Sequence, residues 1–289
     1  MSIQNSLKRN PRRRKFLLAG LSLLIAIYIA VCADFYFRQE WYILEPNVVP
    51  PGKQLNLKEV RFEPIVKGQN GGRAEIYYRK YVTTATPRNE IVFYLHGNKG
   101  NMDLCEFQIV FLLELGYDVW TMDYRRYGDS TGEPSEAAFK DDALDVYELI
   151  TKELPEVPII IWGRSFGSGV AASVAASVAA AKTVKKPKMV VLETPYWSLV
   201  DLVRQKHPYL PPGIFRYELP IHEFLKSANC PIHLIHGTQD EKIPFNSSER
   251  LKVQCESKGN SITGHSIMCG KHDLRDLIEF KEIASKILK

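Results

Sequence analysis

The sequence predicts an α/β fold, in which a mostly parallel central sheet has helices on both faces and a short lid-like insertion. From about residue 90 onward, short and almost wholly apolar runs alternate with segments of helical length. Strands that are apolar throughout are buried on both faces, as in parallel sheets, and parallel neighbours need crossover connections. No repeat or low-complexity linker divides this region, so we expect one domain.

The composition is that of a globular protein, with 45% hydrophobic and 25% charged residues among 289. These proportions exclude collagen-like, disordered and small disulfide-stapled chains. The net charge is +5, but residues 1–33 hold six of the 38 Lys and Arg residues and no acid. The rest of the chain holds the other 32 Lys and Arg residues and all 33 Asp and Glu residues. The folded part therefore has no excess of positive charge. We therefore expect no nucleic-acid partner.

The N-terminus resembles a signal anchor. A basic tail, residues 1–15, precedes Phe16–Ala33, a run of eighteen residues without charge. As a helix this run spans about 27 Å, close to the thickness of a hydrocarbon core. The excess of Lys and Arg on its N-terminal side predicts a cytoplasmic N-terminus and a domain on the extracytoplasmic side, whether periplasmic, lumenal or extracellular. Tyr36, Trp41 and Tyr42 follow at the spacing of an interfacial aromatic belt. A single-pass membrane protein is expected, with the lipid bilayer as its partner.

Two alternatives stay open for this segment. Residues 31–33 (Val-Cys-Ala) resemble a signal-peptide cleavage site, and an apolar helix can also be buried inside a soluble protein. In the preferred organisation a juxtamembrane linker, residues 34–54, leads to the folded domain, residues 55–289, with its insertion at about residues 197–227.

The domain is predicted to begin with an antiparallel hairpin. Residues 60–67 and 73–82 alternate apolar and polar side chains around Gly68, Gly71 and Gly72. The buried parallel strands are then expected, in chain order, at Ile91–Leu95, Asp118–Met122, Val157–Trp162, Met189–Leu192, Pro231–Ile235 and Ser261–Met268.

Two further segments have distinctive composition. Gly167–Lys182 is rich in alanine, and its small side chains predict a helix packed closely on the sheet. A second membrane span is the alternative, which Arg164 disfavours because an intramembrane arginine is costly. Trp197–Ser227 contains four prolines, so it cannot form one helix, and we expect it to cover part of the domain.

The cysteines do not suggest a metal site. Cys105, Cys230, Cys255 and Cys269 follow Cys32 without CxxC pairs or zinc-like Cys/His spacing. Free buried thiols are the preferred interpretation, and a Cys255–Cys269 disulfide stays open for an oxidising compartment.

A candidate nucleophile lies between an apolar strand and the alanine-rich helix. Residues 163–167 read Gly-Arg-Ser-Phe-Gly, which fits the G-x-S-x-G pattern of a sharp strand-to-helix turn. Glycine at both flanks lets the chain turn tightly, so that the Ser165 hydroxyl would stand exposed above the sheet. A plain Gly/Ser turn is the alternative.

A serine nucleophile needs a base and an orienting carboxylate, here in the chain order Ser, Asp, His. Asp240 follows one expected strand and His272 follows the last, and both lie at carboxyl ends where open α/β sheets place their sites. Glu193 or Glu241 could replace the acid, and His265 the base. The remaining histidines are assigned to the insertion or to packing: His207, His222, His233 and His236.

An oxyanion hole is expected from two backbone amides. Acyl transfer needs two N–H donors at about 3 Å from the developing oxyanion. Phe166, directly after the nucleophile, would give one donor, and Asn98 in the glycine-rich loop after His96 would give the other. Phosphate binding by this loop is disfavoured because it lacks the P-loop spacing. The later turn at residues 123–130 is expected to be structural, or else to present Arg125 or Arg126 to substrate.

These motifs together resemble the α/β-hydrolase family, and most of all its single-pass, membrane-anchored branch of lysophospholipase-like and serine-aminopeptidase-like proteins. The resemblance covers about residues 55–289. Its motifs are H-G-N-x-G-N at 96–101, D-Y-R-x-Y-G-x-S-x-G at 123–132, G-R-S-x-G at 163–167, H-G-x-x-D at 236–240 and H-D at 272–273.

The resemblance implies Ser165 as nucleophile, Asp240 as acid and His272 as base. Three positions depart from the family pattern, in which glycine or another small residue is common: Arg126, Ser168 and Lys271. None of them removes a catalytic group, but Arg126 and Lys271 put charge near the expected pocket.

The leading hypothesis is a membrane-anchored serine hydrolase that cleaves carboxylic esters or thioesters through an acyl-enzyme, without a metal or cofactor. The anchor and the apolar insertion favour a lipid-like ester over other small-molecule esters. A peptidase of the same fold is one alternative. The other is a catalytically silent protein that binds a partner at the membrane surface, because fold alone does not dictate function.

Overall fold

The structure of the protein, a computed structural model, describes residues 11–46, 57–68, 73–181 and 184–289. Some predicted features lie outside the described residues: most of the basic tail, residues 47–54 of the linker, Gly71 and Gly72 of the hairpin, and Lys182.

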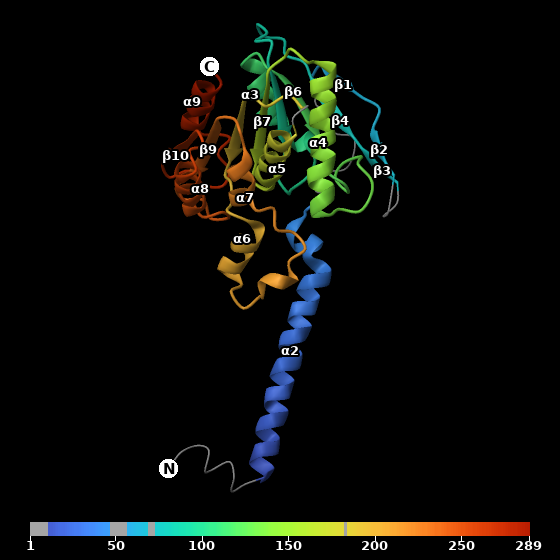
Figure 1. Cartoon of the computed structure of the whole chain (residues 1–289), viewed down its shortest axis with the longest axis vertical. Helices are drawn as coiled ribbons and strands as arrows, with labels where there is room; N and C mark the ends of the chain where they lie inside the picture. The colour runs from blue at the N-terminus through green and yellow to red at the C-terminus, as the bar shows by residue number, and fades with distance from the viewer. Residues whose placement is uncertain (1–10, 47–56, 69–72, 182–183) are drawn as a thin grey trace.

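A central sheet organises the domain, as the apolar runs predict. Within the described residues it has eight strands in the order β1-β4-β6-β5-β7-β8-β9-β10, and Figure 1 shows helices on both sides of it. The neighbours from β6 to β10 are all parallel, which confirms the predicted mostly parallel sheet. Their bounds differ from the expected ones by only a few residues: β5 (Ile91–Leu95), β6 (Asp118–Met122), β7 (Ile159–Arg164), β8 (Met189–Glu193), β9 (Ile232–Gly237) and β10 (Ile262–Ile267).

The predicted hairpin is antiparallel but divides into two ladders. β1 (Glu59–Arg61) pairs with β4 (Tyr78–Tyr81) at the edge of the main sheet, and β4 pairs antiparallel with β6. β2 (Ile65–Lys67) and β3 (Ala74–Ile76) form a separate two-stranded sheet. Pro64 lies between β1 and β2, where it lacks the N–H that a continuous ladder would need.

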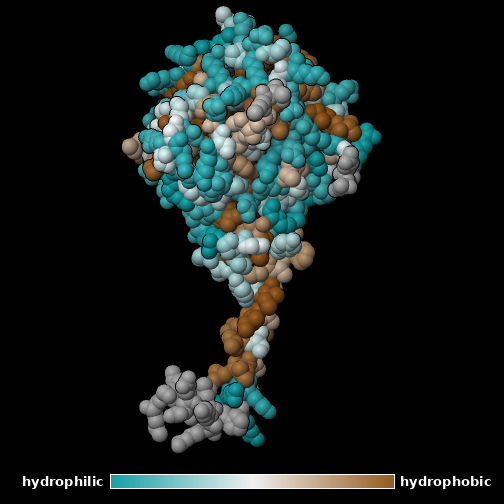
Figure 2. Space-filling view, in the orientation of Figure 1, coloured by the Kyte–Doolittle hydropathy of each residue, from teal (hydrophilic) through white to brown (hydrophobic). Residues whose placement is uncertain are grey.

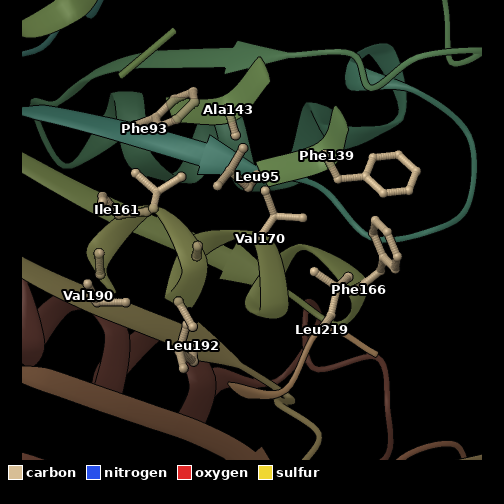
Figure 3. Close-up of a cluster of buried hydrophobic side chains, with 14 of the residues drawn as sticks. Phe93, Leu95, Phe139, Ala143, Ile161, Phe166, Val170, Val190, Leu192 and Leu219 are labelled. Carbon is tan, nitrogen blue, oxygen red and sulfur yellow. The ribbon is translucent and has the colours of Figure 1, made fainter. Parts of the chain in front are cut away.

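Two hydrophobic cores lie on the two faces of the sheet, because side chains alternate along each strand. In β5, Phe93 and Leu95 belong to one core and Val92 and Tyr94 to the other. Figure 3 shows the first core between the strands and the helices that cover them. Its helices are α4 (Glu136–Glu153), α5 (Phe166–Ala180), α7 (Ile221–Ser227) and α8 (Asn246–Ser257); those of the second are α3 (Glu106–Glu114) and α9 (Ile278–Ile287).

Helix α5 lies at the centre of the first core, as its small side chains predict. Val170, Ala171 and Val174 are buried, and the helix packs on β7 and β8 as well as on α4 and α7. Small residues let a helix approach neighbours on several sides at once. This helix therefore fixes the position of its own first residues, which follow Ser165.

The insertion is broken into short helices, as its prolines predict. It contains α6 (Leu199–Lys206), a 3₁₀ turn η2 (Pro212–Ile214) and α7. The Ser198 hydroxyl caps α6 by accepting a hydrogen bond from the amide of Asp201. Figure 1 shows α6 and the chain after it on the side of the domain from which the N-terminal helix leaves.

The N-terminal helix α2 (Pro11–Ile43) is long and apolar enough to cross a membrane, and a signal sequence would meet the same criteria. Figure 2 shows its apolar surface projecting from a largely polar domain. The predicted anchor, residues 16–33, lies within it. The helix then continues through residues expected to be a linker and breaks at Arg38 (φ −109°, ψ 15°), where the chain turns toward the domain.

All five cysteines lie in the described part of the chain and are free thiols. Cys255 is buried whereas Cys269 is exposed, so the alternative of a bridge between them is not seen in this structure.

Candidate active site

Ser165 occupies a strained turn between β7 and α5. Its backbone has φ 52° and ψ −119°, a conformation that side-chain-bearing residues rarely adopt. A Cβ at Gly163 would lie 2.3 Å from the carbonyl oxygen of Gly167, and one at Gly167 would lie 2.2 Å from that of Leu95. The Ser165 amide donates to the Glu193 carbonyl at 2.8 Å, which ties the turn to β8.

Replacing Gly167 by Ala is expected to lower the stability of the fold strongly, because the backbone carbonyl of Leu95 in the central sheet cannot move away from the new methyl group. Overpacking of a rigid core usually costs about 1–3 kcal/mol or more. The measurement is the thermal unfolding temperature of purified protein. Gly213→Ala is the control, since nothing lies within 4 Å of a Cβ there. Equal stability of the two variants would contradict a tightly packed turn.

The structure brings together the three side chains expected to form a catalytic triad. The Ser165 Oγ lies 3.1 Å from His272 Nε2, and His272 Nδ1 lies 2.8 Å from an Asp240 carboxylate oxygen. Because an ionised carboxylate only accepts, Nδ1 carries the hydrogen and Nε2 is left to accept from the Ser165 hydroxyl. This is the hydrogen-bonded order in which a serine is made nucleophilic.

Asp240 is held as an ionised acceptor by several donors. One oxygen accepts from the amides of Lys242 and Ile243 at 2.8 and 2.9 Å. The other lies 3.2 Å from His236 Nε2 in addition to its contact with His272. Burial alone would raise the pKa of Asp240, but the hydrogen bonds from His236 and His272 outweigh it and hold the pKa well below its ordinary value.

The sequence predicts a packing role for His236, and the structure gives this residue a further contact. Its Nδ1 lies 2.7 Å from the Ser248 hydroxyl, and its Nε2 lies 3.0 Å from the Ile243 carbonyl and close to Asp240. The signal for this contact was present in the H-G-x-x-D motif, which puts a strand-end histidine four residues before the acid.

The low pKa of Asp240 predicts how stability depends on pH. A carboxyl whose pKa is depressed in the folded state stabilises the fold above its unfolded pKa, and this contribution is lost on acidification. We expect the free energy of unfolding to decrease as the pH is lowered beyond about 4. The decrease should be smaller in Asp240→Asn, because the amide has no charge to titrate. Urea titrations at about pH 5 and about pH 3 measure both falls. Equal falls in the two proteins would contradict the strong pairing of Asp240.

Neither the alternative acids nor the alternative base belongs to the hydrogen-bonded series of Ser165, His272 and Asp240 in the described residues. Glu193 binds the Arg164 guanidinium at 2.9 Å and the Trp162 indole at 3.1 Å. Glu241 is exposed. His265 lies on β10, where its ring pairs with His233 at 3.2 Å, and no hydrogen bond joins it to Ser165 among the described residues.

Asn98, expected to give an oxyanion donor, is fixed by its other polar groups. Its carbonyl accepts from the Glu45 amide at 2.9 Å and from the Tyr127 hydroxyl at 2.8 Å. Its side chain donates to the Ile43 carbonyl at 2.8 Å. Phe166 is the first residue of α5, where helix amides have no partner within the helix. Both residues line the same cavity as Ser165.

His96 and the turn at residues 123–130 pack beside the site. His96 is buried against Tyr124, with ring centroids 4.4 Å apart, and burial lowers its pKa to about 4. Arg125 forms a two-pronged ion pair with Asp142 at 2.8 and 3.0 Å, so this arginine has the structural role preferred from the sequence.

Two of the three departures from the family pattern have visible consequences. Arg126, where glycine is common, has a φ of 68°, in the region that glycine adopts most easily. Its guanidinium lies 3.8 Å from a carboxylate oxygen of Glu40 on α2. The Ser168 hydroxyl donates to the Ser165 carbonyl at 2.5 Å. Lys271 is exposed.

A cavity of about 520 Å³ opens at Ser165 and His272, within the range of about 300–1,000 Å³ for small-molecule sites. Apolar side chains make up much of its wall, among them Phe35, Tyr196, Leu199, Leu202 and Leu210. The predicted insertion therefore covers the site with α6 and with the loop that follows it.

Comparison with known proteins identifies both a family and distant relatives. The family described as alpha/beta hydrolase fold matches residues 90–229. Lysophosphatidylserine lipase ABHD12 of Danio rerio is 29% identical over 210 residues, covering 66% of this chain and 53% of that protein. The Rattus norvegicus lipase of the same name is 31% identical over 62% of this chain and 48% of that protein. Protein ABHD12B of Homo sapiens is 31% identical over 75% of this chain and 60% of that protein. The chain thus spans about half the length of the curated lipases that it matches.

Solved structures share the fold. The Pyrococcus furiosus esterase Pf2001 aligns with a TM-score of 0.64 at 18% identity, over 85% of this chain and 95% of that one. A thermostable carboxyl esterase from Bacillus coagulans aligns with a TM-score of 0.60 at 14% identity, over 81% of this chain and 97% of the esterase chain. At such identities the likeness establishes the arrangement of the sheet and helices.

Proposed function

Because this chain belongs to the α/β-hydrolase family, and because Ser165, His272 and Asp240 form one hydrogen-bonded series, we propose that it is a serine hydrolase of lipid-like esters or thioesters. The observation that carries the proposal is the 3.1 Å contact between the Ser165 hydroxyl and an imidazole whose other nitrogen bonds Asp240. A serine needs this arrangement to become nucleophilic at neutral pH.

In the proposed mechanism His272 Nε2 takes the proton of Ser165 as its Oγ attacks the carbonyl carbon of the substrate. The negative oxygen of the tetrahedral intermediate is stabilised by the backbone amides of Phe166 and Asn98. His272 then returns the proton to the leaving alcohol or thiol, and the acyl-enzyme remains. A water deprotonated by His272 attacks the acyl-enzyme, and collapse of the second intermediate releases the acid and restores Ser165.

A monoacyl lipid is the substrate class that the site favours. The cavity beside Ser165 is lined largely by apolar side chains. An acyl chain requires such an apolar lining. The relatives named lysophosphatidylserine lipases support the same class, and a lysophospholipid is the leading candidate within it.

We also propose that α2 is a retained membrane anchor. The basic residues before it and the near balance of charges after it favour a cytoplasmic N-terminus, which would place the catalytic domain on the extracytoplasmic side. Under this proposal the functional units are the basic tail at 1–15, the anchor at 16–33, a partly helical connection at 34–54 and the catalytic domain at 55–289.

A substrate panel tests the proposed function. The full-length protein in detergent micelles is incubated with lysophospholipids, short-chain esters, acyl thioesters and peptides, and the released products are quantified. We expect turnover of esters, with the highest kcat/KM for a monoacyl lipid. Turnover of peptides alone would favour the peptidase alternative. A folded protein that turns over no compound would favour a silent binding protein.

A further inference from the structure

The N-terminal helix forms part of the wall of the active-site cavity. Val31, Phe35 and Ile43 of α2 line the same cavity as Ser165 and His272. On the other side, the cavity is lined by Leu199 and Leu202 of α6 and by Leu210. A segment expected only to tether the domain thus faces the proposed nucleophile across a largely apolar space, which Asp34, Lys206 and Lys242 also line.

The contact between α2 and the insertion is specific. The Gln39 side chain is 0% exposed, and it donates to the Ile214 carbonyl at 2.7 Å while accepting from the Arg216 amide at 2.8 Å. Glu40 binds both the Arg216 guanidinium at 2.7 Å and the Tyr217 hydroxyl at 2.9 Å. A buried amide with both polar ends satisfied fixes one geometry, so the helix is held against the insertion.

The cavity reaches the level of the apolar part of the helix. Val31 lies inside the uncharged run at residues 16–33, and the hydroxyl of Tyr28 within that run donates to the Tyr209 carbonyl of the insertion at 3.0 Å. Figure 1 shows the insertion beside this end of α2. If residues 16–33 span the bilayer, the outer end of the cavity lies at the boundary between hydrocarbon and headgroups.

From this continuity we infer that the acyl chain of a bilayer lipid passes directly from the membrane into the active site between α2 and α6, with α2 as one wall of its path. The inference rests on the proposed hydrolase function and names the source and route of the substrate. The chain would exchange lipid neighbours for Val31, Phe35 and the leucines of the insertion, so it would not cross water on the way to Ser165. A chain that stays in apolar surroundings avoids the free-energy cost of exposing its CH₂ groups to water.

A substitution that narrows this route tests it. In full-length protein reconstituted into phosphatidylcholine liposomes, Val31→Trp places a bulky ring in the cavity wall. Ile29→Trp is the matched control, because residues two apart on a helix point to nearly opposite faces, and Ile29 is exposed and not part of the cavity wall. The measured quantity is the ratio of kcat/KM for a long-chain p-nitrophenyl ester to that for p-nitrophenyl acetate.

We expect Val31→Trp to lower this ratio at least about tenfold and Ile29→Trp to leave it at the wild-type value. Equal ratios in the two variants would overturn the inference while leaving the hydrolase proposal intact. Absence of ester hydrolysis by the wild-type protein would instead overturn the proposed function itself.

A second measurement uses the unmodified protein and does not depend on the folding of a variant. A long-chain alkyl fluorophosphonate with a diazirine at its chain end is bonded to Ser165 in liposomes and then irradiated. Crosslinks to residues 28–35 of α2 are expected. Crosslinks confined to residues outside α2 would show that the chain follows another path and would overturn the inference.

Discussion

In the Ser165→Ala variant, kcat for ester hydrolysis is expected to fall about 10⁶-fold, as it does when the nucleophile of a comparable triad is removed. The methyl group of alanine can neither attack the carbonyl carbon nor hold an acyl group. The loss should appear in kcat with little change in the apparent binding of substrate, because the apolar cavity wall is untouched. Steady-state kinetics with a monoacyl lipid and with a short-chain ester measure the loss.

The matched control for this variant is Ser173→Ala on α5, the helix that follows Ser165. Ser173 is buried, and its hydroxyl donates to the Val170 carbonyl at 2.7 Å, without lining the cavity. We expect activity close to that of the wild type. A Ser165→Ala protein that retains a tenth or more of the activity would rule out Ser165 as the nucleophile.

The second large effect is expected from His272→Ala, which removes the only imidazole seen within hydrogen-bond distance of Ser165 in the described part of the chain. Without a base the Ser165 hydroxyl keeps its proton, so we expect a loss of at least about 10³-fold in kcat, and up to about 10⁶-fold. The double variant should be no worse than Ser165→Ala alone, because the two groups act as a unit.

The His265→Ala variant discriminates between His272 and His265, the two histidines that the sequence offers as the catalytic base. The His265 ring contacts His233 on the neighbouring strand and carries no expected catalytic role. Its replacement should leave kcat within a few-fold of the wild type. Small and equal effects of His272→Ala and His265→Ala would contradict the assignment of His272.

The chain order of the site residues could be predicted from the sequence because each one follows a strand. Ser165, Asp240 and His272 come after β7, β9 and β10, whose apolar runs are easy to recognise. In a parallel sheet these strand ends share one edge, so side chains far apart in sequence come together there. The glycines around Ser165 added a local signal, since a tight strand-to-helix turn needs them.

The role of the N-terminal helix could not be predicted in the same way. Gln39 and Glu40 meet Ile214 and Arg216 across more than 170 residues, and no periodicity in either segment indicates this pairing. Residues 34–43 therefore read as a linker. Asn98 could be placed in the oxyanion loop by its motif, but its contacts with Ile43 and Glu45 depend on the same docking of α2.

Two smaller differences have local causes. The hairpin between residues 60 and 82 looked continuous because both arms alternate apolar and polar residues, yet Pro64 interrupts the ladder. Arg126 is a candidate for substrate contact from the sequence because it lies in the turn that follows a strand of the sheet. It lies instead near Glu40, at the junction of α2 with the domain.

The proposed function requires that Ser165 is a nucleophile activated by His272 and Asp240. The most direct measurement is to treat the folded, full-length protein with a fluorophosphonate and to locate the adduct by peptide mass spectrometry. One adduct is expected, on Ser165, and none in the Ser165→Ala protein. A folded sample that remains unmodified, or one modified at another serine, would contradict it.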